Sequence, residues 1–245
     1  MVDTKDLIKA SLDAGRDLLR SPAASDLAKA KAKSSPTPVL VPIRSLGPGH
    51  RDRINRHLLA LDEHDRYLRF GYLANDEQIT RYTDGLNFER DDIFGVYNRK
   101  LELIAMAHLA FSSSAECKSC AEFGVSVLKQ ARGRGYGSRL FDRAVMHARN
   151  EGVELMFIHA LSENTAMLKI AHNAGATVER DGSESEAHLR LPPATLDSRM
   201  SEIVETQFAE MDYKLKSQAK QFWDFLAGLQ ATRRGEREAH DKSAP

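Results

Sequence analysis

The stretch from 125 to 140, VSVLKQARGRGYGSRL, constrains the fold of this chain more than any other. It begins with alternating apolar residues, which is typical of a β-strand, and it ends in an apolar pattern with helical spacing. Between the two lies a basic turn with glycines at alternate positions, Gly133, Gly135 and Gly137. We therefore expect a strand, a glycine turn and a helix to follow one another here.

The turn has the composition of a phosphate-binding site. Glycine lets the backbone approach a ligand closely, and the first amides of a helix are free donors at the positive end of the helix dipole. Arg132 and Arg134 add positive charge among the glycines. A tight strand-to-helix turn without a ligand would also use glycines, so the pattern by itself leaves both interpretations open.

The composition is that of an ordinary globular protein, with 42% hydrophobic and 29% charged residues among 245. Lysine and arginine together number 35, as do aspartate and glutamate, so no net charge attracts nucleic acid or an anionic membrane. No apolar run approaches the ~20 residues that span a bilayer, and the first residues do not resemble a signal peptide. We expect a cytoplasmic protein with neither a nucleic-acid nor a membrane partner.

The two cysteines, Cys117 and Cys120, form a C-x-x-C pair. One such pair cannot complete a zinc site without two further ligands, and a redox pair normally lies at the start of a helix. Here the pair lies in a polar loop before a predicted strand. We expect no metal site and no functional role for these cysteines.

Three segments are predicted along the chain. Residues 1–37 contain an amphipathic helix at 3–20 and a linker rich in alanine, serine, lysine and proline, 38–193 form the folded domain, and 194–245 form a helical extension. Apolar residues of the extension recur every three or four positions, which predicts packing either on the domain or on a second copy in a homodimer. They are Val204, Phe208, Met211, Leu215, Ala219, Phe222, Leu226 and Leu229.

Strand and helix patterns alternate within the domain, which predicts a mixed α/β fold with a central sheet of about seven strands flanked by helices. The run at 155–160 is almost continuously apolar, as in a buried parallel strand, and a right-handed crossover would place it beside the strand before the turn. Strands are expected at 39–44, 93–97, 101–111, 121–128, 155–160, 177–180 and 186–191. Helices are expected at 51–60, 76–86, 135–150 and 164–173, with 62–71 extending or following the first of them.

Residues 121–176 resemble the GNAT superfamily of acyl-CoA N-acyltransferases. Members carry an R/Q-x-x-G-x-G/A loop after a strand, which residues 132–137 match, and an asparagine that starts a later helix, as Asn164 does. A Gly-Phe pair of the family is matched only at Gly175, because alanine follows it. The segments 62–70 and 121–127 look like the bacterial branch that includes protein-lysine acetyltransferases. A Rossmann nucleotide fold is disfavoured, because the glycine turn comes late in the chain instead of after the first strand.

The resemblance implies that acetyl-CoA is the co-substrate. The turn amides would hold its pyrophosphate, and the backbone of the preceding strand would pair with the pantetheine arm. Asn164 would contact the arm from the other side, although a helix cap explains this asparagine equally well. The residues implied in cofactor binding are Val125, Val127, Arg132, Gly133, Arg134, Gly135, Tyr136, Gly137, Ser138 and Asn164.

Transfer to an amine requires a general base, for which the sequence offers two candidates. Glu122 stands at the start of the strand before the turn, where the related branch also has a glutamate. His159 titrates in a suitable range, but a single histidine in a buried strand is more often a hydrogen-bonded core residue, so it ranks second. Many members place a tyrosine as general acid seven residues after the helix asparagine, and here that position is Ala171.

These observations predict an N-acetyltransferase that moves an acetyl group from acetyl-CoA to an amine, either a small molecule or a protein lysine. The missing tyrosine and the appended helices leave one alternative, an acyl-CoA-binding regulatory module with little or no transferase activity.

Overall fold

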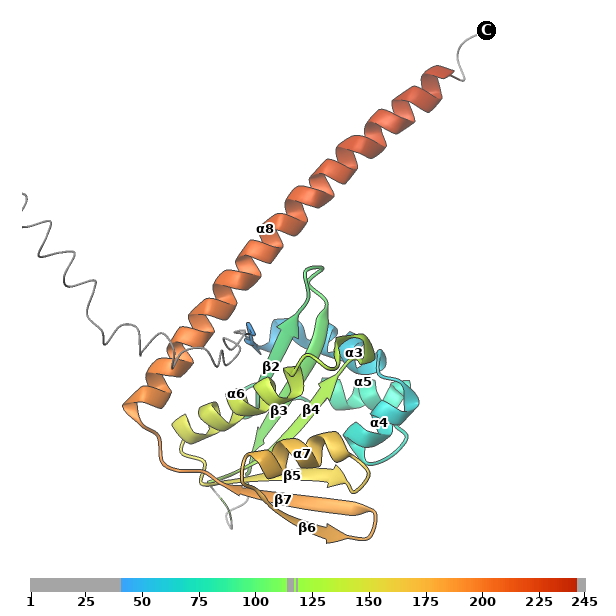
Figure 1. Ribbon diagram of the computed structural model, residues 1–245. Helices are drawn as coiled ribbons and strands as arrows, with labels where there is room; N and C mark the ends of the chain where they lie inside the picture. The colour runs from blue at the N-terminus through green and yellow to red at the C-terminus, as the bar shows by residue number, and fades with distance from the viewer. Residues whose placement is uncertain (1–40, 114–116, 118, 242–245) are drawn as a thin grey trace, which may run out of the picture. The chain divides into compact units, whose positions relative to one another are not determined.

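The computed structural model describes residues 41–113, 117 and 119–241. The predicted N-terminal helix and linker lie outside these residues. The described part contains one seven-stranded sheet of order β1-β2-β3-β4-β5-β7-β6, which confirms the mixed α/β prediction (Figure 1). Its strands are β1 (Arg44–Leu46), β2 (Asp92–Tyr97), β3 (Leu103–Phe111), β4 (Cys120–Val127), β5 (Leu155–Leu161), β6 (Thr177–Asp181) and β7 (Glu184–Arg190).

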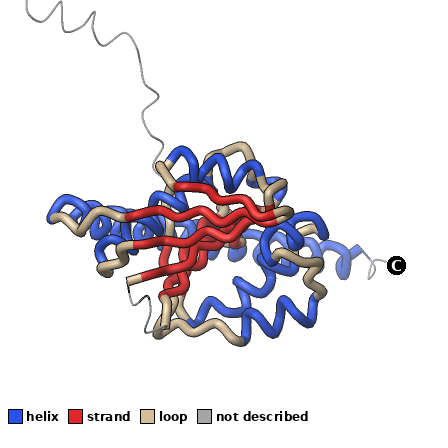
Figure 2. The backbone as a smooth tube through the Cα atoms, turned by 90° about the horizontal axis from the view of Figure 1, so that it is seen from below, coloured by secondary structure: helices blue, strands red, loops and turns tan. Residues whose placement is uncertain are grey.

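Helices cover both faces of the sheet, as the view from below shows (Figure 2). Side chains alternate along β4: Phe123 packs edge-on against Phe141 of α6, whereas Ser126 points to the opposite face and bonds His57 of α3. The helices are η1 (Pro48–His50), α3 (Arg51–Leu59), α4 (Glu63–Phe70), α5 (Asp76–Asp84), η2 (Lys129–Ala131), α6 (Tyr136–Asn150), α7 (Thr165–Asn173) and α8 (Leu196–Asp241).

The strand pairing contains the predicted parallel crossover. The β2–β3 hairpin is antiparallel, β4 pairs with β3, and the crossover through α6 places β5 parallel to β4. β5 then pairs antiparallel with β7, and β7 with β6. Asn75 caps α5 by accepting a hydrogen bond from the Gln78 amide at 2.9 Å, and Gly152 ends α6 in a left-handed conformation, both as expected.

Two predicted strands start too early. The edge strand expected at 39–44 begins only at Arg44, because Pro42 has no N–H group to donate to a ladder. The strand expected from Leu101 begins at Leu103, because Leu101 takes a positive φ of 61° in the turn after β2. Both errors concern strand ends and leave the order of the sheet unchanged.

The prediction that β5 is buried on both faces is wrong. Met156 and Ile158 are buried under the helices, but Phe157 is only partly covered and His159 is exposed. The face on which Phe157 and His159 lie opens into a cleft instead of meeting a helix. One face of β5 is therefore buried, and the other is exposed to solvent.

The long helix α8 follows the domain and packs against α6 and β1. The predicted apolar stripe does not make this contact, since Val204, Met211, Leu215 and Phe222 remain 57–62% exposed. These four residues therefore do not pack on the domain, which was one of the two predicted alternatives. Among the described residues, no helix combines the length and the apolar character needed to cross a membrane.

The two cysteines are joined in a disulfide, which the sequence did not predict. Cys120 is the buried first residue of β4, and Cys117 lies in the loop before it, so the pair enters a strand as expected.

Candidate functional site

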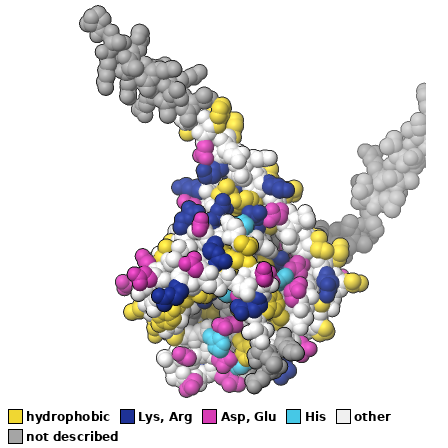
Figure 3. All heavy atoms as spheres, turned by 180° about the vertical axis from the view of Figure 1, so that it is seen from behind, with side chains coloured by type: hydrophobic (Ala, Val, Ile, Leu, Met, Phe, Trp, Pro, Cys, Tyr) yellow, Lys and Arg dark blue, Asp and Glu magenta, His cyan; other side chains and the backbone are white. Residues whose placement is uncertain are grey.

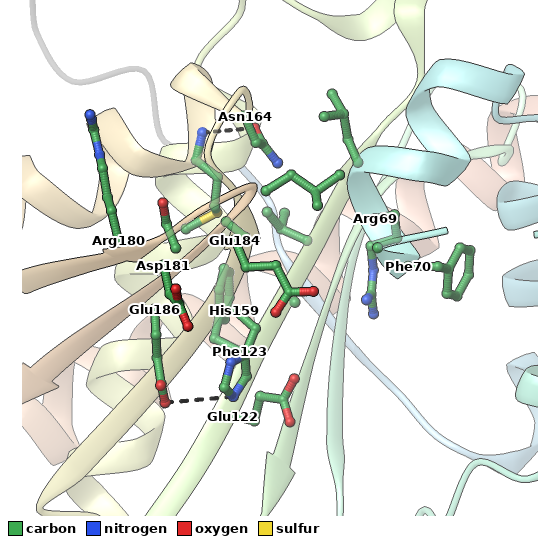
Figure 4. A pocket seen from close by; sticks show the side chains of 18 of the residues that line it. Arg69, Phe70, Glu122, Phe123, His159, Asn164, Arg180, Asp181, Glu184 and Glu186 are labelled. Atoms are coloured by element: carbon green, nitrogen blue, oxygen red, sulfur yellow. Dashed lines mark hydrogen bonds and ion pairs between the residues drawn. The ribbon is translucent and has the colours of Figure 1, made fainter. Parts of the chain in front are cut away.

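The site is a cleft that opens where β4 and β5 separate. The two parallel strands pair only as far as Glu122 and Phe157. Beyond this point β4 stays paired with β3 as far as Val127, and β5 stays paired with β7 as far as Leu161. The strands thus follow different neighbours, and a cleft of about 650 Å³ forms between them (Figure 4).

One edge of β4 is left without a strand partner along this cleft. The Leu128 amide donates to the Ile104 carbonyl of β3, and the Cys120 carbonyl accepts from the Ser112 amide. The backbone amides and carbonyls of the even-numbered residues of β4 therefore point toward β3. Backbone groups alternate in direction along an antiparallel ladder. The amides and carbonyls of Val125 and Val127 therefore face the side from which β5 has departed, where an extended ligand could pair with them.

The glycine turn presents the start of α6 at the end of this edge. Gly133 and Gly135 have φ values of 73° and 75°, a left-handed conformation that glycine adopts without strain. Gly135 is the N-cap residue of α6, and no side chain caps the helix. The first amides, those of Tyr136, Gly137 and Ser138, thus remain available as donors at the positive end of the helix dipole.

The two arginines of the turn have different surroundings. Arg132 forms an ion pair with Asp65, whose side chain is 5% exposed, and its Nε donates to the Val127 carbonyl at 3.3 Å. Arg132 therefore ties the turn to α4 and β4. Arg134 is exposed, so its charge is free to meet an anion at the helix start.

Asn164 is the N-cap of α7, which confirms the capping interpretation. Its Oδ1 accepts a hydrogen bond from the Met167 amide at 3.1 Å. The residue also lines the cleft opposite β4 (Figure 4). Its amide nitrogen is the part left for a ligand, because the cap uses the oxygen.

The structure brings the two candidate bases together. Glu122 and His159 both point into the cleft from the same face of the sheet, next to the place where the strands separate (Figure 4). The His159 side chain is 57% exposed, and its Nε2 lies 3.9 Å from Glu186. The expectation of a core histidine is wrong, because α7 covers only the opposite face of β5.

Carboxylates dominate the far wall of the cleft. Together with Glu122 they give the cleft a negative potential, which favours a positively charged ligand such as an ammonium ion. Acidic side chains and histidines also gather on the lower part of the surface when the molecule is seen from behind (Figure 3). The wall residues are Glu179, Asp181, Glu184 and Glu186, from β6 and β7.

A network of four side chains lies on the α4 side of the cleft, which it reaches at Arg69. Arg69 Nη2 donates to the Tyr82 hydroxyl at 3.0 Å, so the hydroxyl donates its own proton to Nδ1 of His108 at 2.7 Å. The other ring nitrogen of His108 then donates to Asp91 at 3.2 Å. The Arg69 guanidinium lies over β4, only 2.8 Å from the place that a Cβ atom at Gly124 would take, so a side chain at this position would displace the guanidinium.

Burial and neighbouring charges together determine the protonation states of His108 and Asp91. Burial, and secondly the nearby Arg69, lower the pKa of His108 below its usual value, so the ring is neutral at pH 7. Burial alone would raise the pKa of Asp91, but hydrogen bonds from Arg90 and His108 outweigh it and lower the pKa. No local sequence pattern joins these residues, which come from α4, α5, the loop before β2, and β3.

Comparison with known proteins shows a similarity to one family. The model of the acetyltransferase (GNAT) family matches residues 59–175, which span α4 to α7 with β4, β5 and the glycine turn but leave out the wall of the cleft from β6 and β7. The matched region is thus similar to the GNAT acetyltransferase family, and the domain has the GNAT fold. No curated protein sequence matches the chain.

Solved structures of several bacterial proteins share the fold. The GNAT domain of S. lividans PAT is 19% identical with a TM-score of 0.53, and the match covers 62% of this chain and 95% of that domain. A ribosomal-protein-alanine N-acetyltransferase from Brucella melitensis is 16% identical, with a TM-score of 0.50 and coverage of 61% and 99%. A putative acetyltransferase from Acinetobacter baylyi is 17% identical, with a TM-score of 0.51 and coverage of 62% and 94%.

Proposed function

We propose that this chain is an N-acetyltransferase that transfers the acetyl group of acetyl-CoA directly to an amine. The main support is the position of the start of α6, where no side chain caps the helix. This helix start lies at the end of β4, and β4 has an edge along the cleft that pairs with no strand. A diphosphate fits the helix start, and an extended arm fits the edge at Val125 and Val127. The reacting thioester then reaches the part of the cleft into which Glu122 points.

Glu122 acts as the general base in this proposal. The acceptor enters as an ammonium ion drawn by the acidic wall, and Glu122 takes one of its protons. The neutral amine attacks the thioester carbonyl and forms a tetrahedral adduct, whose nitrogen loses a second proton to water. The carbon–sulfur bond then breaks, and coenzyme A leaves as a thiolate. His159 is the second candidate for the base, since it lies in the same cleft.

The thiolate must gain a proton from water. Ala171 occupies the position where many relatives carry a tyrosine, and it is completely buried in the core. The methyl group of Ala171 has no proton to donate to the leaving group. We expect a slower reaction than an enzyme with the phenol would achieve, since a positioned acid contributes about 10²-fold or more.

The acceptor belongs to one of two classes, a small amine or the lysine of a protein. The resemblance of residues 62–70 to the branch with protein-lysine acetyltransferases supports the second class. The acidic wall is compatible with both, because either acceptor carries a positive charge before the reaction.

Two measurements on the full chain test the proposal. Isothermal titration with acetyl-CoA should show binding to one site per chain, and mass spectrometry should show a gain of one acetyl group on members of a panel of amines and lysine peptides. No binding at millimolar acetyl-CoA would remove the proposal. Binding without any acetylated product would instead favour the regulatory module.

A further inference from the structure

The helix α8 docks on its domain through a polar face. Glu202 accepts hydrogen bonds from Arg143 at 2.7 Å, from His147 at 2.5 Å and from Asn150 at 2.5 Å. Burial alone would raise the pKa of Glu202, but these bonds outweigh it and lower the pKa to about 2. About two turns further on, Glu210 pairs with Arg44 at 2.7 Å. These directional contacts fix the rotation of the helix about its own axis.

This rotation turns the apolar side of α8 away from the domain. Ala209 faces the domain and is 2% exposed. A helix turns by roughly 100° per residue, so Met211 lies roughly 200° further round, on the opposite side. Val204, Met211 and Leu215 are accordingly 60–62% exposed, as are Phe222 and Phe225 at 57% and 62%.

The outward side chains follow a heptad pattern, in steps of four and three residues. We call them the outer stripe. This spacing is that of the seam of a two-stranded coiled coil, and glutamine is its one polar member. The outer stripe consists of Val204, Phe208, Met211, Leu215, Gln218, Phe222 and Phe225.

We propose that the outer stripe binds the same stripe of a second copy of this chain, with the two α8 helices antiparallel. Charge favours this arrangement. Residues 200–212 contain four acidic residues and no basic one, whereas 214–226 contain three lysines and one aspartate. Glu202 and Glu210 already pair with the domain. Antiparallel pairing about a two-fold axis near Tyr213 therefore brings the other two acidic residues, Glu205 and Asp212, toward the lysine-rich half of the partner helix. Parallel pairing would place like charges together.

The area is sufficient for a stable dimer. The stripe extends over 22 residues, or roughly 33 Å of helix. Its exposed side chains offer roughly 600 Å² of apolar surface per copy, if each aromatic side chain contributes part of its ~200 Å². Flanking atoms bring this close to the ~800 Å² per partner of a standard interface. An apolar patch of this size is unusual on a monomer.

Light scattering on the full chain tests the proposal. We expect a molar mass of twice the 27.3 kDa of one chain at micromolar concentration. The double variant Met211→Glu and Leu215→Glu should give the mass of one chain, because it places charges at the centre of the seam. Gln221→Glu is the control, since it adds one negative charge at an exposed position of α8 outside the stripe, and it should leave the mass doubled. The single variant Met211→Glu adds the same charge inside the stripe and should lower the mass.

Cross-linking separates the two helix orientations. In the antiparallel dimer, a Val204→Cys chain should form a disulfide with a Phe222→Cys chain and none with itself. Self-linking of Val204→Cys would overturn the antiparallel arrangement. A single-chain mass for the unaltered protein up to high micromolar concentration would overturn the dimer, as would stripe-dependent co-sedimentation of single chains with lipid vesicles. Circular dichroism should show that every variant keeps the native helix content.

Discussion

The two halves of the cleft are built on different principles. The half at the glycine turn offers backbone amides from one continuous segment, β4 to α6, and its side chains add little beyond Arg134. The half that faces it offers side chains from α4, β5, β6 and β7, which lie far apart in the sequence. The first half is thus suited to a constant ligand of fixed shape, and the second is suited to a variable one.

This difference assigns binding and chemistry to separate places. A backbone cradle holds a diphosphate without titrating, so the cofactor half should depend little on pH. The opposite half contains the titratable groups, among them Glu122, His159 and His108. If the assignment is correct, variants in one half should change cofactor affinity, and variants in the other half should change transfer.

The largest effect is expected for Glu122→Gln. Loss of the base should lower kcat by about 10³-fold, within the range that general bases contribute, while acetyl-CoA affinity stays unchanged because the side chain lies outside the turn. Steady-state kinetics and titration calorimetry measure the two quantities. Glu186→Gln is the control, since this cleft carboxylate should leave kcat nearly unchanged. An unaltered kcat in Glu122→Gln would transfer the role to His159.

Gly135→Asp should have the next largest effect, on the other half of the cleft. The variant places an anion at the helix start and a side chain in a left-handed conformation, so acetyl-CoA affinity should fall by about 10²-fold or more. Gly152→Asp matches the strain, because Gly152 has a φ of 84° at the far end of the same helix. Calorimetry should show normal affinity in this control. Equal loss in both variants would mean that strain, rather than the site, causes the effect.

The glycine turn could be predicted because neighbouring residues in the sequence determine its structure. Gly133 and Gly135 are required by their own backbone conformation, and the alternating strand and the helical spacing follow directly on either side. The succession of strands and helices along the chain could be predicted for the same reason, since each element has its own periodicity. Only the ends failed, at Pro42 and Leu101, where a single residue decides the hydrogen bonding.

The opposite half of the cleft could not be predicted, because the positions of its side chains depend on how distant segments pack together. His159 was expected in the core since its neighbours Met156 and Ile158 are apolar, but which face of β5 meets a helix depends on where α7 packs. The network from Arg69 to Asp91 joins four elements, and no spacing in the sequence connects them. The outward orientation of the α8 stripe depends likewise on polar contacts such as that of Glu202 with Arg143.

A smaller, pH-dependent effect is expected at Tyr82. This side chain links Arg69 to His108, so Tyr82→Phe should raise the KM for the acceptor about tenfold, equivalent to one lost hydrogen bond, and leave acetyl-CoA affinity unchanged. Tyr72→Phe is the control, since its ring is 48% exposed. A change in cofactor affinity in Tyr82→Phe would contradict the separation of the two halves.

The sign of the pH effect follows from the lowered pKa of His108. A folded-state pKa below the unfolded value of 6.5 means that the stabilisation by the neutral ring is present above pH 6.5 and is lost as the pH falls through the folded pKa. Protonated Nδ1 cannot accept the Tyr82 proton, so the acceptor KM should rise in acid in the unaltered protein. In Tyr82→Phe this rise should be weaker, because the bond is already absent.

The smallest effects are expected within the cofactor half, where the two arginines of the turn should differ. Arg134→Ala should weaken acetyl-CoA binding about fivefold, since its exposed charge meets the phosphates, and added salt should reduce the difference. Arg132→Ala should weaken it only about twofold, because its guanidinium already pairs with Asp65 and acts on the cofactor through the position of the turn. Titrations at low and high salt measure both. A larger, salt-sensitive loss of acetyl-CoA affinity in Arg132→Ala would show that Arg132 leaves Asp65 to bind the phosphates. Side chains as well as backbone amides would then bind the diphosphate.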